Sequence, residues 1–324
     1  MPQMNMVQAI NDALRIALRS DPRVVVLGED VGRVGGVFRV TSGLIEEFGE
    51  DRVIDSPLSE SGIVGAALGM ALYGKTPVAE IQFADFVFPA YDQIVNELAK
   101  YRYRSGGDHS ANVVIRMPAG GGIRGGHYHS QHPEAMFVHV PGLKVVCPAT
   151  PYDAKGLLLA ALEDPDPVIF LEPKRVYRAA KGDVPEEAYT VPLECARIVR
   201  DGRDITLVAY GAMLYEALDA AQTAFEQGVD CEVIDLRTIW PVDIHTIVRS
   251  VKKTGRLVVV HEAPKTGGFA GELISLVCEK AFYSLEAAPV RVTGFDTPFP
   301  YTLEMEYLPL SHRILPALIE AARA

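Results

Sequence analysis

Short apolar segments alternate with longer segments of helical spacing along the first half of the chain. The apolar segments cover residues 24–27, 53–54, 77–81, 113–115, 143–147 and 168–171. The segments that predict helices cover residues 6–19, 62–72, 91–103 and 152–163. Strands that are apolar at nearly every position are buried on both faces, which is typical of a parallel sheet covered by helices. The sequence therefore predicts an α/β fold.

A second alternation of the same kind follows a polar stretch. Residues 172–204 are rich in Lys, Arg, Glu and Pro, so we interpret them as a surface linker with a short hairpin. Beyond them, strands are expected at 205–209, 231–234, 257–260 and 290–293, and helices at 213–227, 244–251, 271–282 and 312–322. We expect two domains, residues 1–190 and 191–324, because 324 residues exceed what one core usually holds.

Charge and hydropathy exclude some classes of protein. The formal net charge of -11 argues against a nucleic-acid-binding face, which would be basic. No apolar run approaches the roughly 20 residues of a membrane span, and the N-terminus lacks the basic and apolar regions of a signal peptide, so we expect a cytoplasmic protein. The four cysteines are widely spaced and form no Cys-x-x-Cys pair, which favours reduced thiols over disulfides or metal ligands.

One acidic residue stands at the start of a predicted helix. Ser59 is a natural N-cap, which places Glu60 in the first turn, where the helix dipole favours a carboxylate. Gly62, Gly65 and Gly69 then lie on one face of the helix, and each lowers its stability by roughly 1 kcal/mol relative to Ala. This loss indicates that another backbone, from this chain or from a partner, approaches the face closely.

Aromatic residues cluster after the strand predicted at 77–81. Phe83, Phe86 and Phe88 precede the next helix. The carboxyl ends of parallel strands are where open α/β sheets bind ligands, and an aromatic ring there can stack on a planar heterocycle. Burial in an ordinary core is the alternative for these three rings.

A loop rich in glycine and histidine follows the strand predicted at 113–115. It contains His127, His129 and His132. The residues alone leave three interpretations open. The glycines could cradle a phosphate, although the P-loop lysine is absent. The histidines could bind a metal, although no carboxylate or cysteine spacing supports it, or the loop could carry an active-site histidine.

Three basic residues occur near these segments, Arg116, Arg124 and Lys174. Each could attract the carboxylate of a substrate. Charged side chains of this kind are usually solvated at the surface, so we assign no functional role to any of the three.

Taken in order, the motifs of this chain resemble the beta subunit of thiamine-diphosphate-dependent 2-oxo acid dehydrogenases. The carrying motifs are Leu-Gly-Glu-Asp-Val-Gly at 27–32, Pro-Leu-Ser-Glu-Ser-Gly-Ile at 57–63, Glu-Ile-Gln-Phe-Ala-Asp at 80–85, Tyr-Arg-Tyr-Arg-Ser-Gly-Gly at 101–107, His-Ser-Gln at 129–131, Pro-Gly-Leu-Lys-Val-Val at 141–146 and Asp-Leu-Arg-Thr at 235–238. The resemblance extends over essentially the whole chain. It implies a pyrimidine-binding domain followed by a transketolase C-terminal-like α/β domain.

The resemblance also implies roles for individual residues. Glu60 matches the acid that hydrogen-bonds N1′ of the cofactor's aminopyrimidine and so activates its 4′-amino group as a base. Phe86 matches the residue that stacks on this ring, and Leu58 and Gln82 match positions that line the same pocket. His129 matches a residue that binds the substrate carboxylate and assists acyl transfer to a lipoyl group. The active-site interpretation of the histidine loop is thereby favoured.

Other contacts to the cofactor are expected on a different chain. In the family, Mg²⁺ and the diphosphate are held through a Gly-Asp-Gly segment, which does not occur here. The resemblance therefore implies an alpha subunit that holds Mg²⁺, an alpha2-beta2 heterotetramer, and docking of that tetramer on a dihydrolipoyl acyltransferase core with its lipoyl domain.

Some relatives bind potassium through a loop that matches Ala161 and Asp164, with backbone near Val113, so these residues are a candidate potassium site.

The resemblance implies decarboxylation of a 2-oxo acid and transfer of the acyl group to lipoyl. Gln-Phe-Ala-Asp at 82–85 and Val-Thr-Gly-Phe-Asp-Thr-Pro at 292–298 favour a branched-chain substrate of the 2-oxoisovalerate class. A pyruvate dehydrogenase, an acetoin-cleaving or a transketolase-like enzyme half is the alternative among enzymes. A ligand-binding or scaffold protein is the non-enzyme alternative, and the joint presence of Glu60, Phe86 and His129 argues against it.

Overall fold

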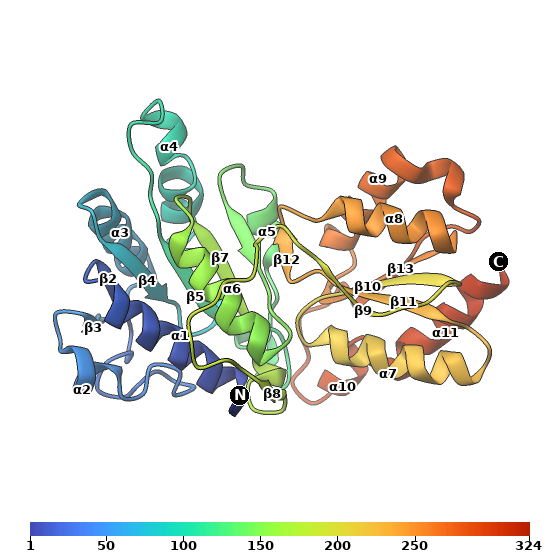
Figure 1. The fold of residues 1–324 in the computed structure, drawn as a ribbon, viewed down its shortest axis with the longest axis horizontal. Coiled ribbons are helices and arrows are strands. Elements are labelled where there is room, and N and C mark those ends of the chain that lie inside the picture. The colour runs from blue at the N-terminus through green and yellow to red at the C-terminus, as the bar shows by residue number, and fades with distance from the viewer.

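Two large sheets organise the computed structural model, which describes residues 1–324 (Figure 1). The first sheet has seven strands in the order β12–β6–β7–β5–β4–β2–β3. Their bounds are β2 (Val24–Gly28), β3 (Val53–Asp55), β4 (Thr76–Glu80), β5 (Val114–Ala119), β6 (Lys144–Val146), β7 (Val168–Pro173) and β12 (Thr238–Trp240). Every neighbouring pair from β6 to β3 is parallel, so the predicted α/β sheet is confirmed.

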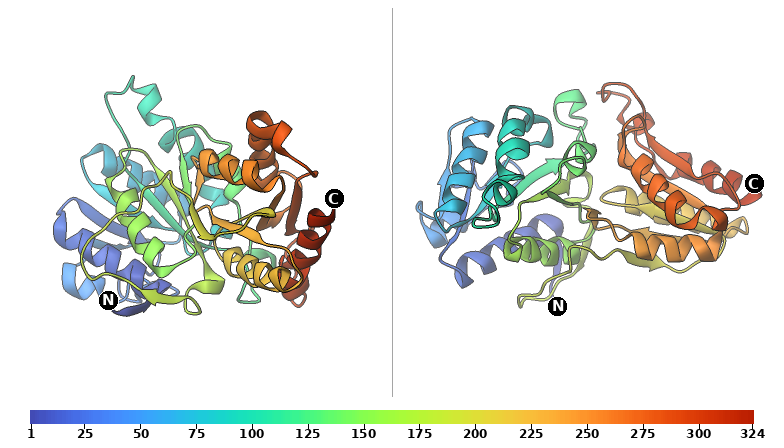
Figure 2. Two further views of the ribbon diagram at one scale, coloured as in Figure 1. Left: turned by 45° about the vertical axis from the view of Figure 1, so that its right-hand side comes forward. Right: turned by 90° about the horizontal axis from the view of Figure 1, so that it is seen from above.

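Helices cover both faces of this sheet (Figures 1 and 2). On one face α1 (Met6–Ser20) and α6 (Pro151–Glu163) lie side by side, and on the other lies α3 (Glu60–Leu72). The shorter helices are α2 (Leu44–Phe48), α4 (Tyr101–Arg104) and α5 (Glu134–Val138). All residues of β4, β5 and β7 are buried, as expected of strands enclosed between two helical layers.

The second sheet has five strands in the order β14–β13–β10–β11–β9. Its strands are β9 (Arg197–Arg200), β10 (Ile205–Ala209), β11 (Cys231–Asp235), β13 (Leu257–Pro264) and β14 (Val290–Gly294). Helices α7 (Met213–Glu226) and α11 (Ser311–Arg323) pack together on one face, and α8 (Ile244–Thr254) and α9 (Phe269–Ala281) on the other (Figure 1). The short helix α10 (Glu304–Tyr307) lies near the first sheet's loops.

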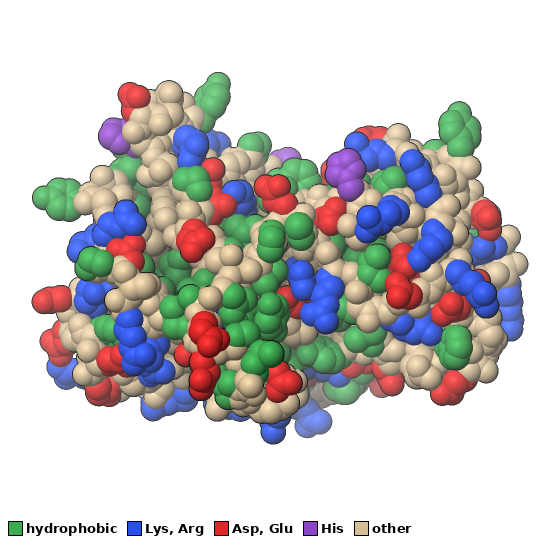
Figure 3. All heavy atoms as spheres, in the orientation of Figure 1, with side chains coloured by type: hydrophobic (Ala, Val, Ile, Leu, Met, Phe, Trp, Pro, Cys, Tyr) green, Lys and Arg blue, Asp and Glu red, His purple; other side chains and the backbone are tan.

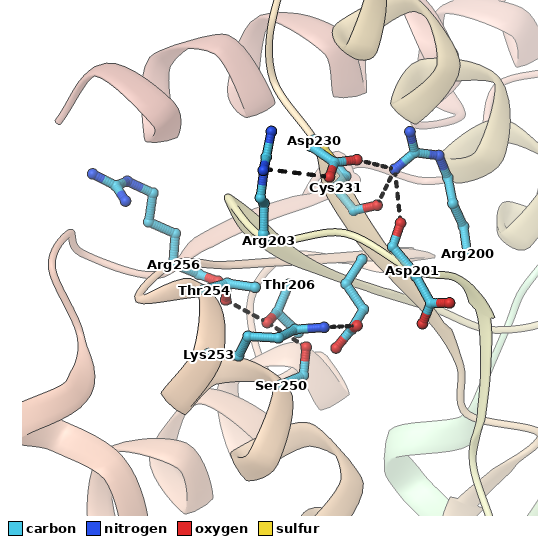
Figure 4. A network of polar contacts seen from close by, with 11 residues as sticks. Arg200, Asp201, Arg203, Thr206, Asp230, Cys231, Ser250, Lys253, Thr254 and Arg256 are labelled. Carbon is cyan, nitrogen blue, oxygen red and sulfur yellow. Dashed lines mark hydrogen bonds and ion pairs between the residues drawn. The ribbon is translucent and has the colours of Figure 1, made fainter.

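Polar contacts attach β9 and α8 to this second sheet (Figure 4). Arg200 of β9 donates to the carboxylate of Asp230 at 2.9 Å. The buried hydroxyl of Thr206 on β10 is 2.6 Å from that of Ser250 and 2.7 Å from that of Thr254, both on α8. These hydroxyls satisfy one another where water is excluded, so the helix is fixed in one position on the sheet.

Three strands differ from the predictions because their partners are remote in sequence. Within the expected linker, β8 (Lys181–Asp183) pairs with β1 (Gln3–Asn5) at the N-terminus and β9 joins the second sheet, so the predicted hairpin is wrong. The unpredicted strand β12 belongs to the second half of the chain, yet it adds an antiparallel edge to β6 of the first sheet.

The helix predicted at 91–103 is interrupted by the π-helical segment Gln93–Leu98 before α4.

Surface and thiol features agree with an ordinary globular chain. Acidic and basic side chains are interspersed over the face shown in Figure 3. None of the helices is both long and apolar enough to cross a membrane. The four cysteines form no disulfide, and Cys147 and Cys231 are buried, which confirms the prediction of reduced thiols.

Candidate active site

The carboxyl ends of β2, β3, β4 and β5 meet at one edge of the first sheet, because neighbouring strands there are parallel. The segments that leave these ends carry the predicted site residues in the order Leu58, Glu60, Gln82, Phe86 and His129. The fold therefore brings all five to one edge.

Glu60 is the first residue of α3 and is half-buried. Ser59 caps this helix, since its side chain accepts a hydrogen bond from the Gly62 amide at 3.3 Å, as predicted. Glu29 directly follows β2. Burial, followed by the charges of Asp30 and Glu60, raises the pKa of Glu29 above its ordinary value. Two carboxylates thus lie close enough at the start of α3 for their charges to interact.

Gln82 fixes the turn that carries Glu29. Its side-chain amide donates to the carboxylate of Asp30 at 3.2 Å and to the carbonyl of Glu29 at 3.4 Å. Asp30 has a φ of +59°, a left-handed conformation that needs such local support. The other predicted pocket residue, Leu58, is 74% exposed and contributes no closed wall within this chain.

The rings of Phe83 and Phe86 form a cluster with the imidazole of His129. Phe83 and His129 have ring centroids 4.6 Å apart, Phe86 and His129 5.4 Å, and Phe83 and Phe86 5.4 Å, all with edge-to-face geometry. Phe83 is buried, so the core alternative is correct for this residue. Phe86 is half-buried and Phe88 is 41% exposed, so both rings present surface at the sheet edge.

The glycines of the histidine loop permit close packing against the second half of the chain. A β-carbon added at Gly120 would lie 2.6 Å from a Glu262 carboxylate oxygen, and one at Gly121 would lie 2.8 Å from the Phe299 ring. The Gly121 amide donates to Glu262 at 2.8 Å. A carboxylate that already occupies a loop amide would repel a phosphate, so the phosphate-cradle interpretation is wrong.

The three histidines of this loop do not converge. His127 is exposed and lies against the Tyr128 ring, whereas His132 is buried with its Nδ1 2.7 Å from the Glu134 carboxylate. Burial opposes the charged form of His132, but Glu134 outweighs it and raises the pKa of His132 well above its ordinary value. No group of three or more His, Cys, Asp or Glu side chains has the arrangement of a metal site, so the metal interpretation is wrong.

The expectation that the three basic residues are solvated at the surface is correct for only one of them. Arg124 is exposed. Arg116 is fully buried and donates to Glu172 at 2.7 and 2.9 Å and to Glu80 at 2.7 Å. Burial opposes its charge, but the two carboxylates raise the pKa of Arg116 further. Lys174 is only 4% exposed. Both are enclosed because the surrounding carboxylates compensate their charge.

The candidate potassium residues already have partners in the chain. The Asp164 carboxylate accepts a hydrogen bond from the Lys144 ammonium. The carbonyl of Val113 accepts one from the amide of Val168 at 3.0 Å, and Ala161 is fully buried. A bound potassium ion would have to replace the ammonium at Asp164, so potassium binding stays a prediction.

The edge that carries Glu60 is incompletely covered. Large apolar side chains are exposed in the segments that follow β2 to β5, namely Val34, Val37, Leu58, Phe88, Ile123 and Tyr128. A β-carbon added at Gly69 of α3 would meet no atom within 4 Å, so packing inside this chain does not explain the glycine face of the helix. Two cavities of about 500 and 1080 Å³ lie between the halves of the chain and are not lined by Glu60 or Phe86. Exposed apolar surface of this kind marks an interaction site.

Comparisons with known proteins agree with this architecture. Residues 2–180 match the model for "Transketolase, pyrimidine binding domain", and residues 194–314 that for "Transketolase, C-terminal domain". The chain is 56% identical over 309 residues to the mitochondrial 2-oxoisovalerate dehydrogenase subunit beta of Dictyostelium discoideum, covering 95% of this chain and 83% of that protein. It is 51% identical to the pyruvate dehydrogenase E1 component subunit beta of Acholeplasma laidlawii, covering 99% and 98%. A solved structure titled "Split gene transketolase, inactive beta4 tetramer" shares the fold with a TM-score of 0.81 at 23% identity, over 99% of this chain and 98% of that one.

Proposed function

Because this chain belongs to the family of 2-oxo acid dehydrogenase beta subunits, we propose that it forms half of an active site that decarboxylates a branched-chain 2-oxo acid of the 2-oxoisovalerate class. The family depends on thiamine diphosphate, and its beta subunits act with alpha subunits. The observation that carries the proposal is the convergence of Glu60, Phe86 and His129 at one open sheet edge. The substrate class is supported by the relative named for 2-oxoisovalerate.

The residues at this edge fit the aminopyrimidine of thiamine diphosphate. Glu60 offers a half-buried carboxyl group that would hydrogen-bond N1′, and the half-buried Phe86 offers a ring face for stacking. When bound, the cofactor supplies the nucleophilic carbon and the electron sink for decarboxylation. Glu60 would hold the proton at N1′ and keep the neighbouring amino group able to act as a base.

His129 would act on the substrate and on the lipoyl group. Its imidazole packs against the rings of both Phe83 and Phe86, so its orientation is set before any substrate arrives. In this position it would bind the carboxylate of the 2-oxo acid. It would then donate a proton to a lipoyl sulfur as the acyl group is transferred.

We propose that an alpha subunit completes the site and holds Mg²⁺ with the diphosphate, in an alpha2-beta2 tetramer that docks on a dihydrolipoyl acyltransferase core. The exposed apolar side chains around Glu60 and the open face at Gly69 support a partner at this edge. The division into residues 1–190 and 191–324 is part of the same proposal, and the separate sheets support it. The potassium site at Ala161, Asp164 and Val113 is proposed from the resemblance alone.

Replacement of Glu60 tests the central claim. With the co-expressed alpha subunit, Glu60→Gln should lower the decarboxylation rate on a branched 2-oxo acid by about 10²-fold or more, because the amide cannot exchange a proton with N1′. Size-exclusion chromatography should show an unchanged tetramer. Glu46→Gln is the matched control, since Glu46 is also in the first turn of a helix but is exposed and away from the sheet edge. Wild-type decarboxylation by Glu60→Gln would contradict the mechanism.

Substrate comparison separates the two classes of relative. We expect kcat/KM to be about 10-fold to 200-fold higher for 2-oxoisovalerate than for pyruvate, the range that a small difference in apolar contact provides. The reverse order would favour the pyruvate class, to which the 51% identical relative belongs by name. Cleavage of acetoin without turnover of either acid would contradict both.

A further inference from the structure

Lys174 is a buried cation without a hydrogen-bond partner in the chain. It follows β7 directly and lies beside the point where the histidine loop leaves β5, because Ala119 pairs with Pro173. Its Nζ is fully enclosed, makes no hydrogen bond, and lies 5.6 Å from the centroid of the Phe83 ring. His129 packs edge-to-face with the same ring, with the two centroids 4.6 Å apart. Burial of an ammonium costs free energy unless neighbouring charges compensate it, so we expect charged groups around Lys174.

Three carboxylates, each from a different element, act on this ammonium. They are Asp85 after β4, Glu262 of β13 and Glu304 of α10. The same three carboxylates bind backbone amides of the histidine loop. The hydrogen bonds run from Gly121 to Glu262 at 2.8 Å, from Arg124 to Glu304 at 3.0 Å, and from Ser130 and Gln131 to Asp85 at 3.1 and 3.0 Å. Lys174 is therefore the common countercharge of the groups that anchor the loop on both sides of His129.

Two further buried polar atoms lie at the Asp85 anchor. The second carboxylate oxygen of Asp85 and the hydroxyl of Ser130 make no hydrogen bond within the chain. The Lys174 ammonium supplies donors, the Asp85 oxygen is an acceptor, and the Ser130 hydroxyl is both. Buried water commonly joins polar groups of this kind with about three hydrogen bonds.

We propose that Lys174 is a positioning residue for acyl transfer, which acts through ordered water enclosed with Asp85 and Ser130 to keep the loop that carries His129 in its working geometry. The inference rests on the proposed role of His129. Lys174 itself contacts neither substrate nor lipoyl group, because it is buried and its Nζ is fully enclosed.

A charged Lys174 is required for this anchoring, and its charge is sensitive to pH. Burial lowers the pKa of Lys174 to about 8, although the carboxylates of Asp85, Glu262 and Glu304 favour the charged form. Above that pH the ammonium loses its proton, and the three carboxylates lose their countercharge. Acyl transfer should then decline on the alkaline side. The kcat for decarboxylation at saturating substrate should not follow the same titration, because in that step His129 only binds the substrate carboxylate.

The test uses the alpha-beta complex and two assays between pH 6.5 and 9.5. Decarboxylation is followed with an artificial electron acceptor, and acyl transfer is followed as acylation of a free lipoyl domain. In the wild type, acyl transfer should fall with an apparent pKa near 8. Lys174→Arg should retain activity at neutral pH and remove this decline, because the guanidinium keeps its charge. Lys174→Met should lose about 10-fold to 100-fold in acyl transfer at every pH, with kcat for decarboxylation at saturating 2-oxo acid within about twofold of the wild type.

The controls separate this inference from the proposed function. Lys181→Met is the matched control, since Lys181 is exposed on β8 and its side chain makes no hydrogen bond. If Lys174→Met does not fold, the wild-type and Lys174→Arg profiles decide alone. An alkaline decline that persists in Lys174→Arg would overturn the inference. Intact acyl transfer by His129→Gln would instead overturn the role of His129, whatever Lys174 does.

Discussion

The rings of Phe83 and His129 stand nearly perpendicular to each other, at 87°, with their centroids 4.6 Å apart. This contact joins the segment after β4 to the loop after β5. Phe83 is buried and also packs edge-to-face on Phe38, with the centroids 5.4 Å apart. Because its own ring is fixed by this packing, Phe83 restricts the orientation of the imidazole. The position of His129 thus depends on Phe83, whose side chain takes part in no reaction step.

Shortening this ring should affect acyl transfer more than decarboxylation. Phe83→Leu removes the edge-to-face contact, and the imidazole gains freedom. We therefore expect acylation of the lipoyl domain to fall about 10-fold, while kcat for decarboxylation at saturating substrate changes less than threefold. Phe137→Leu is the control, because Phe137 is also buried. This replacement should lower only the free energy of unfolding, by about 1 kcal/mol. Equal losses in both half-reactions for Phe83→Leu would contradict the assignment.

The glycine face of α3 allows a test of the predicted interface. Gly69→Ala should stabilise the isolated chain by up to about 1 kcal/mol, because alanine favours the helix and the added methyl group meets no atom. Assembly with the alpha subunit should weaken, since the methyl group would obstruct a closely approaching backbone. Gly182→Ala on β8, where an added β-carbon also meets no atom, should leave assembly unchanged. Unaltered assembly of Gly69→Ala, measured by analytical ultracentrifugation, would place the partner elsewhere.

A buried aspartate predicts a pH-dependent stability. Burial, and then the charge of Asp153, raises the pKa of Asp235 from 3.8 to about 7. The folded state therefore binds a proton more tightly than the unfolded state. This contribution is fully present below pH 3.8 and is lost as pH rises to about 7. Asp235→Asn removes the penalty of the charged form.

The predicted gain follows from the size of that shift. At pH 8 Asp235→Asn should stabilise the chain by up to about 4 kcal/mol, and the gain should shrink as pH falls toward 4. Chemical denaturation at pH 8 and pH 5 measures the difference. The exposed Asp201→Asn is the control and should show no such pH dependence. A constant effect of Asp235→Asn across this range would refute the titration.

The proposed potassium site makes a competition prediction. Because Lys144 and potassium would bind the same Asp164 carboxylate, Lys144→Met should increase any stabilisation by potassium. We expect the thermal midpoint of this variant to be higher in KCl than in choline chloride at equal ionic strength, and Asp164→Asn should abolish the difference. Identical midpoints in both salts for the wild type and for Lys144→Met would show that this site does not bind potassium.

Local sequence was sufficient for the elements that build the first sheet and for the start of α3. Fully apolar runs at β4, β5 and β7 predict burial on both faces, and the structure confirms it. Ser59 before Glu60 predicts the helix start correctly, because capping depends on residues three apart. Motifs spread over the chain were likewise enough to recognise the family.

What the sequence by itself determined was the set of strands and helices and the residue types at the site. The tertiary structure decided which of them meet. The strands β8 and β12 have three residues each, and their stability comes from partners far away in the chain. Arg116 and Lys174 look like surface residues in sequence, because burial of a cation is favourable only where folding brings carboxylates around it. The tertiary structure also leaves the edge at Glu60 exposed, because no segment of this chain covers its apolar side chains.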